Sequence, residues 1–438
     1  MEKNKNQQKP NTLLRYEREK RGWSQNKLGE LIGADPTMIS RWERGSRNPE
    51  RIYQEKLCNI FNKDAEELGL LESHRKTVSY IDQEVYPIVQ VEEDVSLAPT
   101  RFLNMGPEEL TKRYINEKEH FLELKINGIE WTIPEVVIFD NSRLHLPPTA
   151  ITVQVDTLHP EYTIPPKIAG RAQDILEEIE HYFYDSTTIR LNEMQFNDHR
   201  ITLTVSKAHY LQFVATNYAM DALLKQKGWT RSLRDIVHPS TRLCRLEDSP
   251  LCNHIGVGTL VFTLDNYLVI PVRSRENIAT WQQRIGPSIA GATSYDDDMW
   301  SFKAGPVASW IREGREELGL ENSDFIDEND IFFGITRDLL RGGKPELYFA
   351  TQLNITKARL EQKFRKARDK WENIELQWLE FTNPLIPPTN EEERATFLQE
   401  FIYLLHKYQG LHSRPTQIGF TFWLKYMLSQ QDVKEGIG

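Results

Sequence analysis

TLLRYEREKRGWSQNKLGELIGADPTMISRWERGSRNPE, residues 12–50, decides the fold of the N-terminal part of the chain. Ser24 is suited to cap a helix that begins after it, because its hydroxyl can accept a hydrogen bond from an otherwise unpaired backbone N–H. Leu28, Leu31 and Ile32 follow at spacings of three and four, which predicts one apolar helix face. Gly33 then permits a tight turn.

A second helix is predicted after this turn. Asp35 is its N-cap, and Pro36 stands at the first helical position, where a missing N–H costs nothing. Ile39 and Trp42 are predicted to face inward, which leaves an outward face of Thr37, Ser40 and Arg41. Two short helices joined in this way allow the second to lie in the major groove of DNA.

This stretch resembles the XRE/Cro-like family of bacterial and phage regulators, over residues 15–70. The matching residues are Arg15, Gly22, Ser24–Gln25, Leu28–Gly33, Ile39–Ser40, Trp42–Glu43, Gly45 and Pro49. Gly29 stands where the family usually has alanine, a small change at a point of close helix contact.

The resemblance implies roles for individual side chains. Gln25 and the backbone near Arg44 would contact phosphate, while Thr37 and Arg41, with Ser40 on the same face, would meet base edges. An arginine can bond guanine through two hydrogen bonds, the commonest specific contact. The implied partner is a double-stranded DNA operator, and a homodimer is expected because such readers usually bind paired half-sites.

Length and charge indicate a multidomain protein. The chain has 438 residues, which exceeds one typical domain. Residues 1–56 hold 13 Lys and Arg against 8 Asp and Glu, whereas the whole chain carries a net charge of −10. A basic end on an acidic body is typical of a DNA-binding module joined to a part that does not bind DNA, although small helical domains are also often mildly basic.

Cysteine usage and hydropathy bear on localisation. Cys58, Cys244 and Cys252 lack metal-ligand spacing and favour neither a disulfide framework nor a zinc site, as expected in a reducing cytoplasm. No apolar run approaches the ~20 residues of a membrane span, and the polar residues 1–10 do not look like a signal peptide. We therefore expect a cytoplasmic protein, associated with the nucleoid when bound to DNA, with no membrane partner.

The rest of the chain alternates strand and helix signals. Turns are predicted at Asn127–Gly128, Asp265–Asn266 and Gly342–Gly343, and a long helix over 209–228. The predicted divisions are a DNA-binding domain at 1–73, a β-rich region of unknown role at 77–165, an α+β segment at 166–255, a further domain at 256–410 and a tail at 411–438.

A predicted helix near 306–319 carries the other chemistry-bearing cluster. Glu313, Glu316 and Glu317 stand at i, i+3 and i+4, so three carboxylates share one helix face. Such a face repels itself unless a cation neutralises it. Mg²⁺ (or Mn²⁺) suits carboxylates together with substrate phosphate oxygens, and it can generate a nucleophilic water.

The order Arg312-Glu313-x-x-Glu316-Glu317-x-Gly319 resembles the second half of the Nudix box. The family's fold is an α/β/α sandwich around a mixed sheet, and its substrates are nucleoside diphosphates linked to another group. The resemblance covers roughly 256–410 and implies catalytic roles for Arg312, Glu313, Glu316 and Glu317. It also implies metal ligation by the three glutamates and Gly291. The expected fold is thus an all-α helix-turn-helix domain, an α+β region and a Nudix-like α/β/α sandwich.

Several positions depart from the box. Gly291 and Arg312 are separated by residues 292–311, a longer loop than the family's, and Ala304 takes the place of the loop's glutamate. Asp296–Asp298 are candidate substitutes, Glu372 and Glu375 candidate later acids. Gly314 replaces an apolar residue expected to pack inward.

Three functions are compatible with these patterns. The first is a transcription regulator whose Nudix-like domain senses a nucleotide-type ligand, a nucleoside diphosphate derivative such as one of ADP-ribose type. The second is a Mg-dependent pyrophosphohydrolase with an accessory DNA-binding module. The third is a binding module that recruits a protein partner. The alternative explanation of the glutamates is an amphipathic helix with a solvated acidic face, and the flanking hairpins favour the Nudix-like fold over it. The rebuilt loop favours sensing over turnover.

Overall fold

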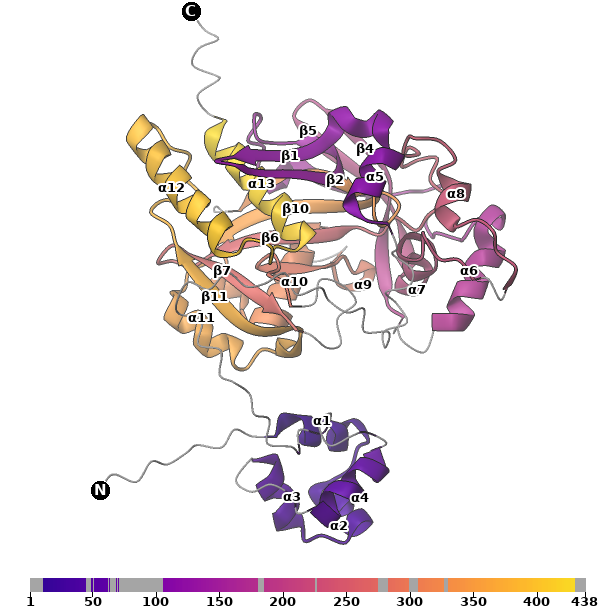
Figure 1. Ribbon diagram of the computed structural model, residues 1–438. Coiled ribbons are helices and arrows are strands. Elements are labelled where there is room, and N and C mark those ends of the chain that lie inside the picture. The colour runs from indigo at the N-terminus through magenta and orange to yellow at the C-terminus, as the bar shows by residue number, and fades with distance from the viewer. Residues whose placement is uncertain are drawn as a thin grey trace, which may run out of the picture. The chain divides into compact units, whose positions relative to one another are not determined.

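The computed structural model describes residues 11–44, 49, 51–61, 63, 68, 70, 105–179, 185–224, 227–274, 283–298, 306–326 and 330–429. The chain divides into two compact units, residues 1–92 and 93–438 (Figure 1). The N-terminal unit is helical and the second is a mixed α/β unit. The predicted multidomain organisation, helical first and α/β after, is confirmed.

The described part of the N-terminal unit contains α1 (Thr12–Lys20), α2 (Gln25–Ile32), α3 (Pro36–Glu43) and α4 (Arg51–Phe61). Its helices are short, so packing of their apolar faces has to stabilise them. The buried side chains come from each helix and from the segment that follows: Leu14, Leu28, Ile32, Ile39, Trp42, Leu57, Phe61, Leu68 and Leu70.

The second unit is built on an eight-stranded mixed sheet. Its strand order is β1-β2-β9-β10-β6-β7-β11, with β8 paired to β6. The bounds are β1 (Phe121–Ile126), β2 (Ile129–Asp140), β6 (Gly256–Phe262), β7 (Tyr267–Arg273), β8 (Ile289–Ala292), β9 (Ile331–Asp338), β10 (Lys344–Gln352) and β11 (Asn373–Glu380). The pairing of β10 with β6 is parallel, and the other pairings in this sheet are antiparallel.

A second, three-stranded sheet has the order β3-β5-β4. Its strands are β3 (Ile151–Val155), β4 (Thr187–Asn197) and β5 (Arg200–His209). The helices of the unit are α5 (Pro107–Arg113), α6 (Pro166–Ile179), α7 (Tyr210–Phe213), α8 (Leu233–Val237), α9 (Tyr295–Asp298), α10 (Pro306–Leu318), α11 (Lys357–Phe364), α12 (Glu391–Lys407) and α13 (Arg414–Leu428).

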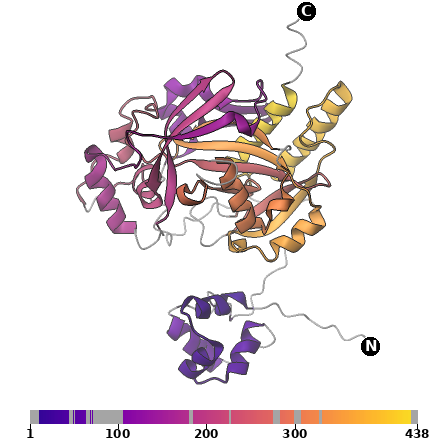
Figure 2. The same cartoon turned by 180° about the vertical axis from the view of Figure 1, so that it is seen from behind.

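Side-chain alternation along β10 separates two hydrophobic cores. Leu347 and Phe349 join the core that contains Trp310 of α10 and the inner side chains of the small sheet. Tyr348 and Ala350 join the core that contains α12 and α13. Because successive strand residues point to opposite faces, the large sheet is covered on both sides, with α12 and α13 on one and α10 on the other (Figures 1 and 2).

The predicted hairpin turns are confirmed. Asn127 and Gly128 have φ of 45° and 78°, and Ile126 pairs directly with Ile129 across the turn. Positive φ at both central residues matches the twist of the flanking strands, which is why Asn-Gly is favoured there. The other two predicted turns join β6 to β7 and β9 to β10.

The structure groups the segments of the second unit differently from the predicted divisions. The segment after Gly410, expected to be a tail, contains α13, whose Trp423 is fully buried in the core. Within 77–165, strands β1 and β2 belong to the same sheet as β9, so residues 165, 255 and 410 do not separate compact units. Residues 71–104 of the predicted first and second regions lie outside the described residues.

The helix predicted over 209–228 is short. It comprises α7 and one π-helical turn, Val214–Tyr218. Asn217 there donates side-chain hydrogen bonds to Asn253 Oδ1 and to the Arg341 carbonyl, at 3.1 and 3.0 Å. These tertiary bonds satisfy a buried amide, which local helix periodicity cannot reveal.

Candidate functional site

The turn between α2 and α3 is built by local capping. Ser24 Oγ accepts from Lys27 N at 3.0 Å, and Asp35 Oδ1 accepts from Thr37 N at 2.8 Å. Gly33 ends α2 in the left-handed conformation, with φ of 71°. Each cap satisfies a helix-end donor that has no partner within its own helix. The predicted caps at Ser24 and Asp35 and the turn at Gly33 are therefore confirmed.

Gly29 permits the close approach of this turn. A Cβ built on Gly29 would lie 2.5 Å from the Ala34 carbonyl oxygen. That distance is well below ordinary van der Waals contact, so an alanine at this position would require the turn to shift. Glycine in place of the family's usual alanine therefore lets the backbone of this turn pack more closely.

The two faces of α3 are those predicted. Ile39 and Trp42 are buried in the unit's core. Thr37 and Arg41 are exposed and Ser40 is half-buried. The face that the resemblance assigns to base edges is accordingly accessible on this unit.

Gln25 and Arg44 are held by neighbours. Gln25 Nε2 donates to Glu43 Oε2 at 2.7 Å, and Arg44 Nε donates back to the Ser40 carbonyl at 3.2 Å. Glu43 also forms a bidentate pair with Arg18, at 2.6 and 3.0 Å. Both partners of this ion pair are nearly fully buried, and it joins α1 to α3. This ion pair was not predicted from the sequence, in which only the match of Glu43 to the family pattern points to it.

The glutamates of α10 are associated with arginines. Arg312 Nη1 lies 3.0 Å from Glu313 Oε1 and 3.1 Å from Glu316 Oε2, and its Nη2 donates to the Ala292 carbonyl at 2.7 Å. Arg368 Nη1 lies 2.8 Å from Glu316 Oε1. The structure thus brings Arg312 together with two of the three predicted carboxylates and with the strand that carries Gly291.

Glu317 is the most deeply buried of the three, with 2% of its surface exposed. Burial raises its pKa well above the usual value, and the nearby carboxylates of Glu372 and Glu313 raise it further. The pKa of Glu313 is raised to about 8, first by burial, although Arg312 opposes the shift. The cluster therefore holds carboxyl groups that resist ionisation.

Of the two later acids considered, Glu372 is the one near the cluster. It appears among the charges that raise the pKa of both Glu313 and Glu317, and it lies 3.7 Å from Arg273 Nη2. Glu375 is exposed and takes no part.

The candidate substitutes in the loop are only partly described. Asp296 Oδ2 accepts from Thr187 Oγ1 at 2.9 Å, which ties it to β4 of the small sheet. Ala304 lies outside the described residues, and nothing is described of the Asp297 and Asp298 side chains.

Two glycines explain how α10 packs. A Cβ on Gly291 would lie 2.2 Å from Glu313 Cδ, so Glu313 rests directly on the backbone of β8. A Cβ on Gly314 would lie 2.8 Å from Ile289 Cδ1 and 3.1 Å from Phe325 Cζ. The space expected for an apolar side chain at position 314 is thus taken by residues from neighbouring elements.

The donor chemistry of this face suits a divalent cation, but the side-chain arrangement does not form a three-ligand site. In the described ranges, no group of three or more His, Cys, Asp or Glu side chains is arranged to hold a metal ion. Arg312 supplies positive charge to Glu313 and Glu316 instead. Metal binding would require these side chains to rearrange.

The geometry defines the N-terminal unit as a DNA-binding helix-turn-helix domain. Residues 14–68 match the family model described as "Helix-turn-helix". A search of curated proteins found no match to the chain.

Two solved structures are similar to parts of this chain. A Deinococcus radiodurans protein, DR0079, aligns at 16% identity over 29% of this chain and 67% of its own, with a TM-score of 0.20. The bifunctional NMN adenylyltransferase/ADP ribose pyrophosphatase of Francisella tularensis aligns at 13% identity over 35% of this chain and 41% of its own, with a TM-score of 0.19. At such scores neither likeness carries an argument. Across the described ranges, no helix is both long and apolar enough to cross a membrane.

Proposed function

We propose that this protein is a transcription regulator in which the second unit senses a nucleotide-type ligand and changes the affinity of the helix-turn-helix unit for DNA. The DNA-binding half is supported by the family match at residues 14–68. The sensing half is supported by the box-like order of α10 and its packing on a β-strand.

The observation that carries the proposal is the pairing of Arg312 with the acidic face of α10. Glu313 and Glu317 are buried, their pKa values are raised, and Arg312 contacts two of the three α10 glutamates. A hydrolase of the kind that the motif resembles needs ionised carboxylates around a metal ion. A face whose glutamates are paired with an arginine is better suited to binding a ligand than to turning it over.

The proposed ligand is a nucleoside diphosphate derivative of ADP-ribose type. Its diphosphate would interact with Arg312, and Mg²⁺ or Mn²⁺ would accompany it, held by Glu313, Glu316, Glu317 and the Gly291 carbonyl after rearrangement. We further propose that the protein acts as a homodimer on paired half-sites of an operator.

The test uses the purified full chain and an operator selected from random DNA. Fluorescence anisotropy at one fixed salt concentration measures operator affinity with and without ADP-ribose and Mg²⁺, since salt alone alters such affinities strongly. We expect a change of about fivefold or more, the usual range of coupling between sites. The ligand must favour one arrangement for any change to occur.

Two matched variants give the control. Glu317→Gln should abolish the ligand effect, whereas Glu375→Gln, an exposed acid on β11, should leave it intact. An unchanged operator affinity, with no thermal stabilisation by ADP-ribose, would contradict the sensing proposal. Release of AMP by the wild type, lost in Glu317→Gln, would instead favour the pyrophosphohydrolase.

A further inference from the structure

A cavity of about 560 Å³ lies in the second unit, at strands β2 and β9 of the large sheet. It opens between the 3₁₀ helix Ile115–His120, strands β2 and β9, and the 242–247 loop. Its size falls within the usual range for small-molecule pockets. No residue of α10 lines the cavity, so it is separate from the acidic face of that helix.

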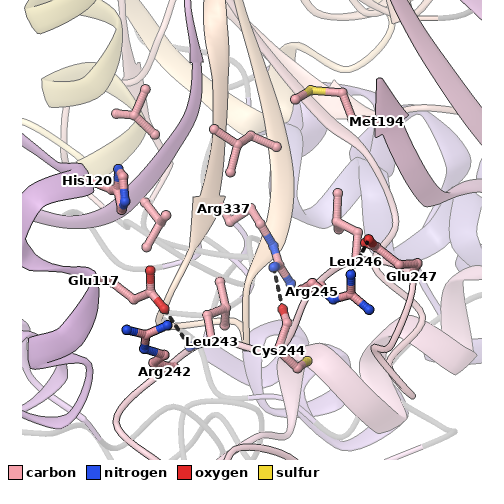
Figure 3. Close-up of a pocket in the computed structure, with 13 residues that line it drawn as sticks. Glu117, His120, Met194, Arg242, Leu243, Cys244, Arg245, Leu246, Glu247 and Arg337 are labelled. Atoms are coloured by element: carbon pink, nitrogen blue, oxygen red, sulfur yellow. Dashed lines mark hydrogen bonds and ion pairs between the residues drawn. The ribbon is translucent and has the colours of Figure 1, made fainter. Parts of the chain in front are cut away.

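Arg337 of β9 lies in the middle of this cavity's lining (Figure 3). It is only 4% exposed. Its Nε donates to the Gly343 carbonyl at 3.0 Å and its Nη1 to the Cys244 carbonyl at 2.6 Å. Within the described part of the chain, Nη2 has no hydrogen-bond partner, and no carboxylate lies within ion-pair distance of the guanidinium.

This is an unusual state for a buried arginine. A buried charge is costly unless a counter-charge accompanies it. Arg234 shows the usual solution: it is fully buried and makes a bidentate pair with Asp221 at 2.6 and 2.9 Å. Arg337 donates to two carbonyl groups instead. Burial lowers its pKa, while Cys244 and the Glu117 carboxylate oppose the shift without forming an ion pair with it. A carboxylate or phosphate from outside the chain would supply the missing counter-charge.

The remaining lining supports an anion with an apolar body. Arg242 and Arg245 add positive charge at exposed positions. Of the two acids in the lining, Glu117 accepts a hydrogen bond from Leu243 N at 3.1 Å and Glu247 pairs with Arg245 at 3.4 Å. The apolar side chains that complete the wall are Val136, Val137, Ile138, Met194, Leu243 and Leu246.

We propose that this cavity binds a small organic anion, whose carboxylate or phosphate group pairs with Arg337 while the apolar wall holds its body. The guanidinium fork suits either group, because both accept two parallel N–H donors. This site does not depend on the proposed function of α10, and the two can fail separately.

The test uses three probes on the full chain: phenyl phosphate, benzoate and the neutral benzamide. We expect one or both anions to bind in isothermal titration calorimetry and benzamide not to bind. Comparison of phenyl phosphate with benzoate identifies the preferred anionic group. Arg337→Gln should weaken anion binding roughly tenfold or more, because a charge-assisted hydrogen bond is lost. Arg359→Ala, which removes an exposed cation on α11, should leave it unchanged.

A second readout locates the probe without any variant. Cys244 lines the cavity and is half-buried, Cys58 is half-buried in the other unit, and Cys252 is buried. Bound anion should slow iodoacetamide alkylation of Cys244 but not of Cys58, as followed by mass spectrometry. Equal binding of benzamide, or anion binding that leaves Cys244 alkylation unchanged, would overturn the proposal. Absence of anion binding at millimolar concentration would overturn it as well.

Discussion

The buried Arg18–Glu43 pair offers a quantitative test of how the helix-turn-helix unit is held together. Its side chains are 8% and 4% exposed, and its contacts are bidentate. Glu43→Ala removes the carboxylate that forms the bidentate pair with the buried Arg18 guanidinium, which costs about 3–5 kcal/mol. Across the 55 residues that match the family model, total stability is expected to be about 3–8 kcal/mol. The single truncation should therefore remove most of the unit's stability.

The matched control replaces both partners. Arg18→Met with Glu43→Leu removes the two charges together, so no uncompensated charge stays buried, and the loss should be smaller by about 2 kcal/mol or more. This double variant also removes the acceptor of Gln25. It should therefore weaken DNA binding while the unit remains folded.

Hydrogen exchange measured by mass spectrometry on the full chain provides the assay. Peptides from residues 12–44 report the opening free energy of the N-terminal unit, and peptides from β10 provide an internal reference. A loss below about 1 kcal/mol in Glu43→Ala would refute the reasoning. An equal loss in the single and double variants would refute it too.

Three further predictions concern the proposed DNA-reading face and α10. Arg41→Ala should weaken operator binding by about 1–3 kcal/mol and relax specificity at one base position. Gln25→Ala, at the position to which the resemblance assigns a phosphate contact, should weaken all sequences alike; anisotropy on operator and scrambled DNA distinguishes them. Stability should fall as pH rises, because the Glu313 pKa is raised from 4.5 to about 8 in the folded state. The stabilising contribution of Glu313 is complete below about pH 4.5 and is lost as pH passes about 8. Glu313→Gln should flatten the slope of unfolding temperature against pH in thermal melts. An unchanged slope would be evidence against the burial of Glu313. Gly314→Val should destabilise the second unit by about 1–3 kcal/mol through overpacking, detectable as a lower unfolding midpoint in urea.

Much of the local structure could be predicted from the residues. The Asn127–Gly128 turn and the caps at Ser24 and Asp35 depend on interactions within a few residues, so neighbouring residues in the sequence predict them. The same holds for the carboxylate face of α10, since i, i+3 and i+4 spacing determines it.

Long-range packing could not be predicted in this way. Trp423 lies in a segment without a distinctive local pattern, yet it fills the core beneath the large sheet. Asn217 lies in the π-helical turn of a predicted helix and donates to Asn253 and Arg341, which come from distant parts of the chain. The spacing of residues along the sequence does not predict such contacts.

The sequence by itself determined the helix-turn-helix unit and the common face of Glu313, Glu316 and Glu317. Caps, turns and helical periodicity are local, and they operate before distant segments meet. Only the tertiary structure decided the raised pKa values of Glu313 and Glu317 and the absence of an ion-pair partner for Arg337 within the described residues. Burial and electrostatic pairing depend on which segments pack together, and a group's pKa or need for a counter-ion follows from that packing.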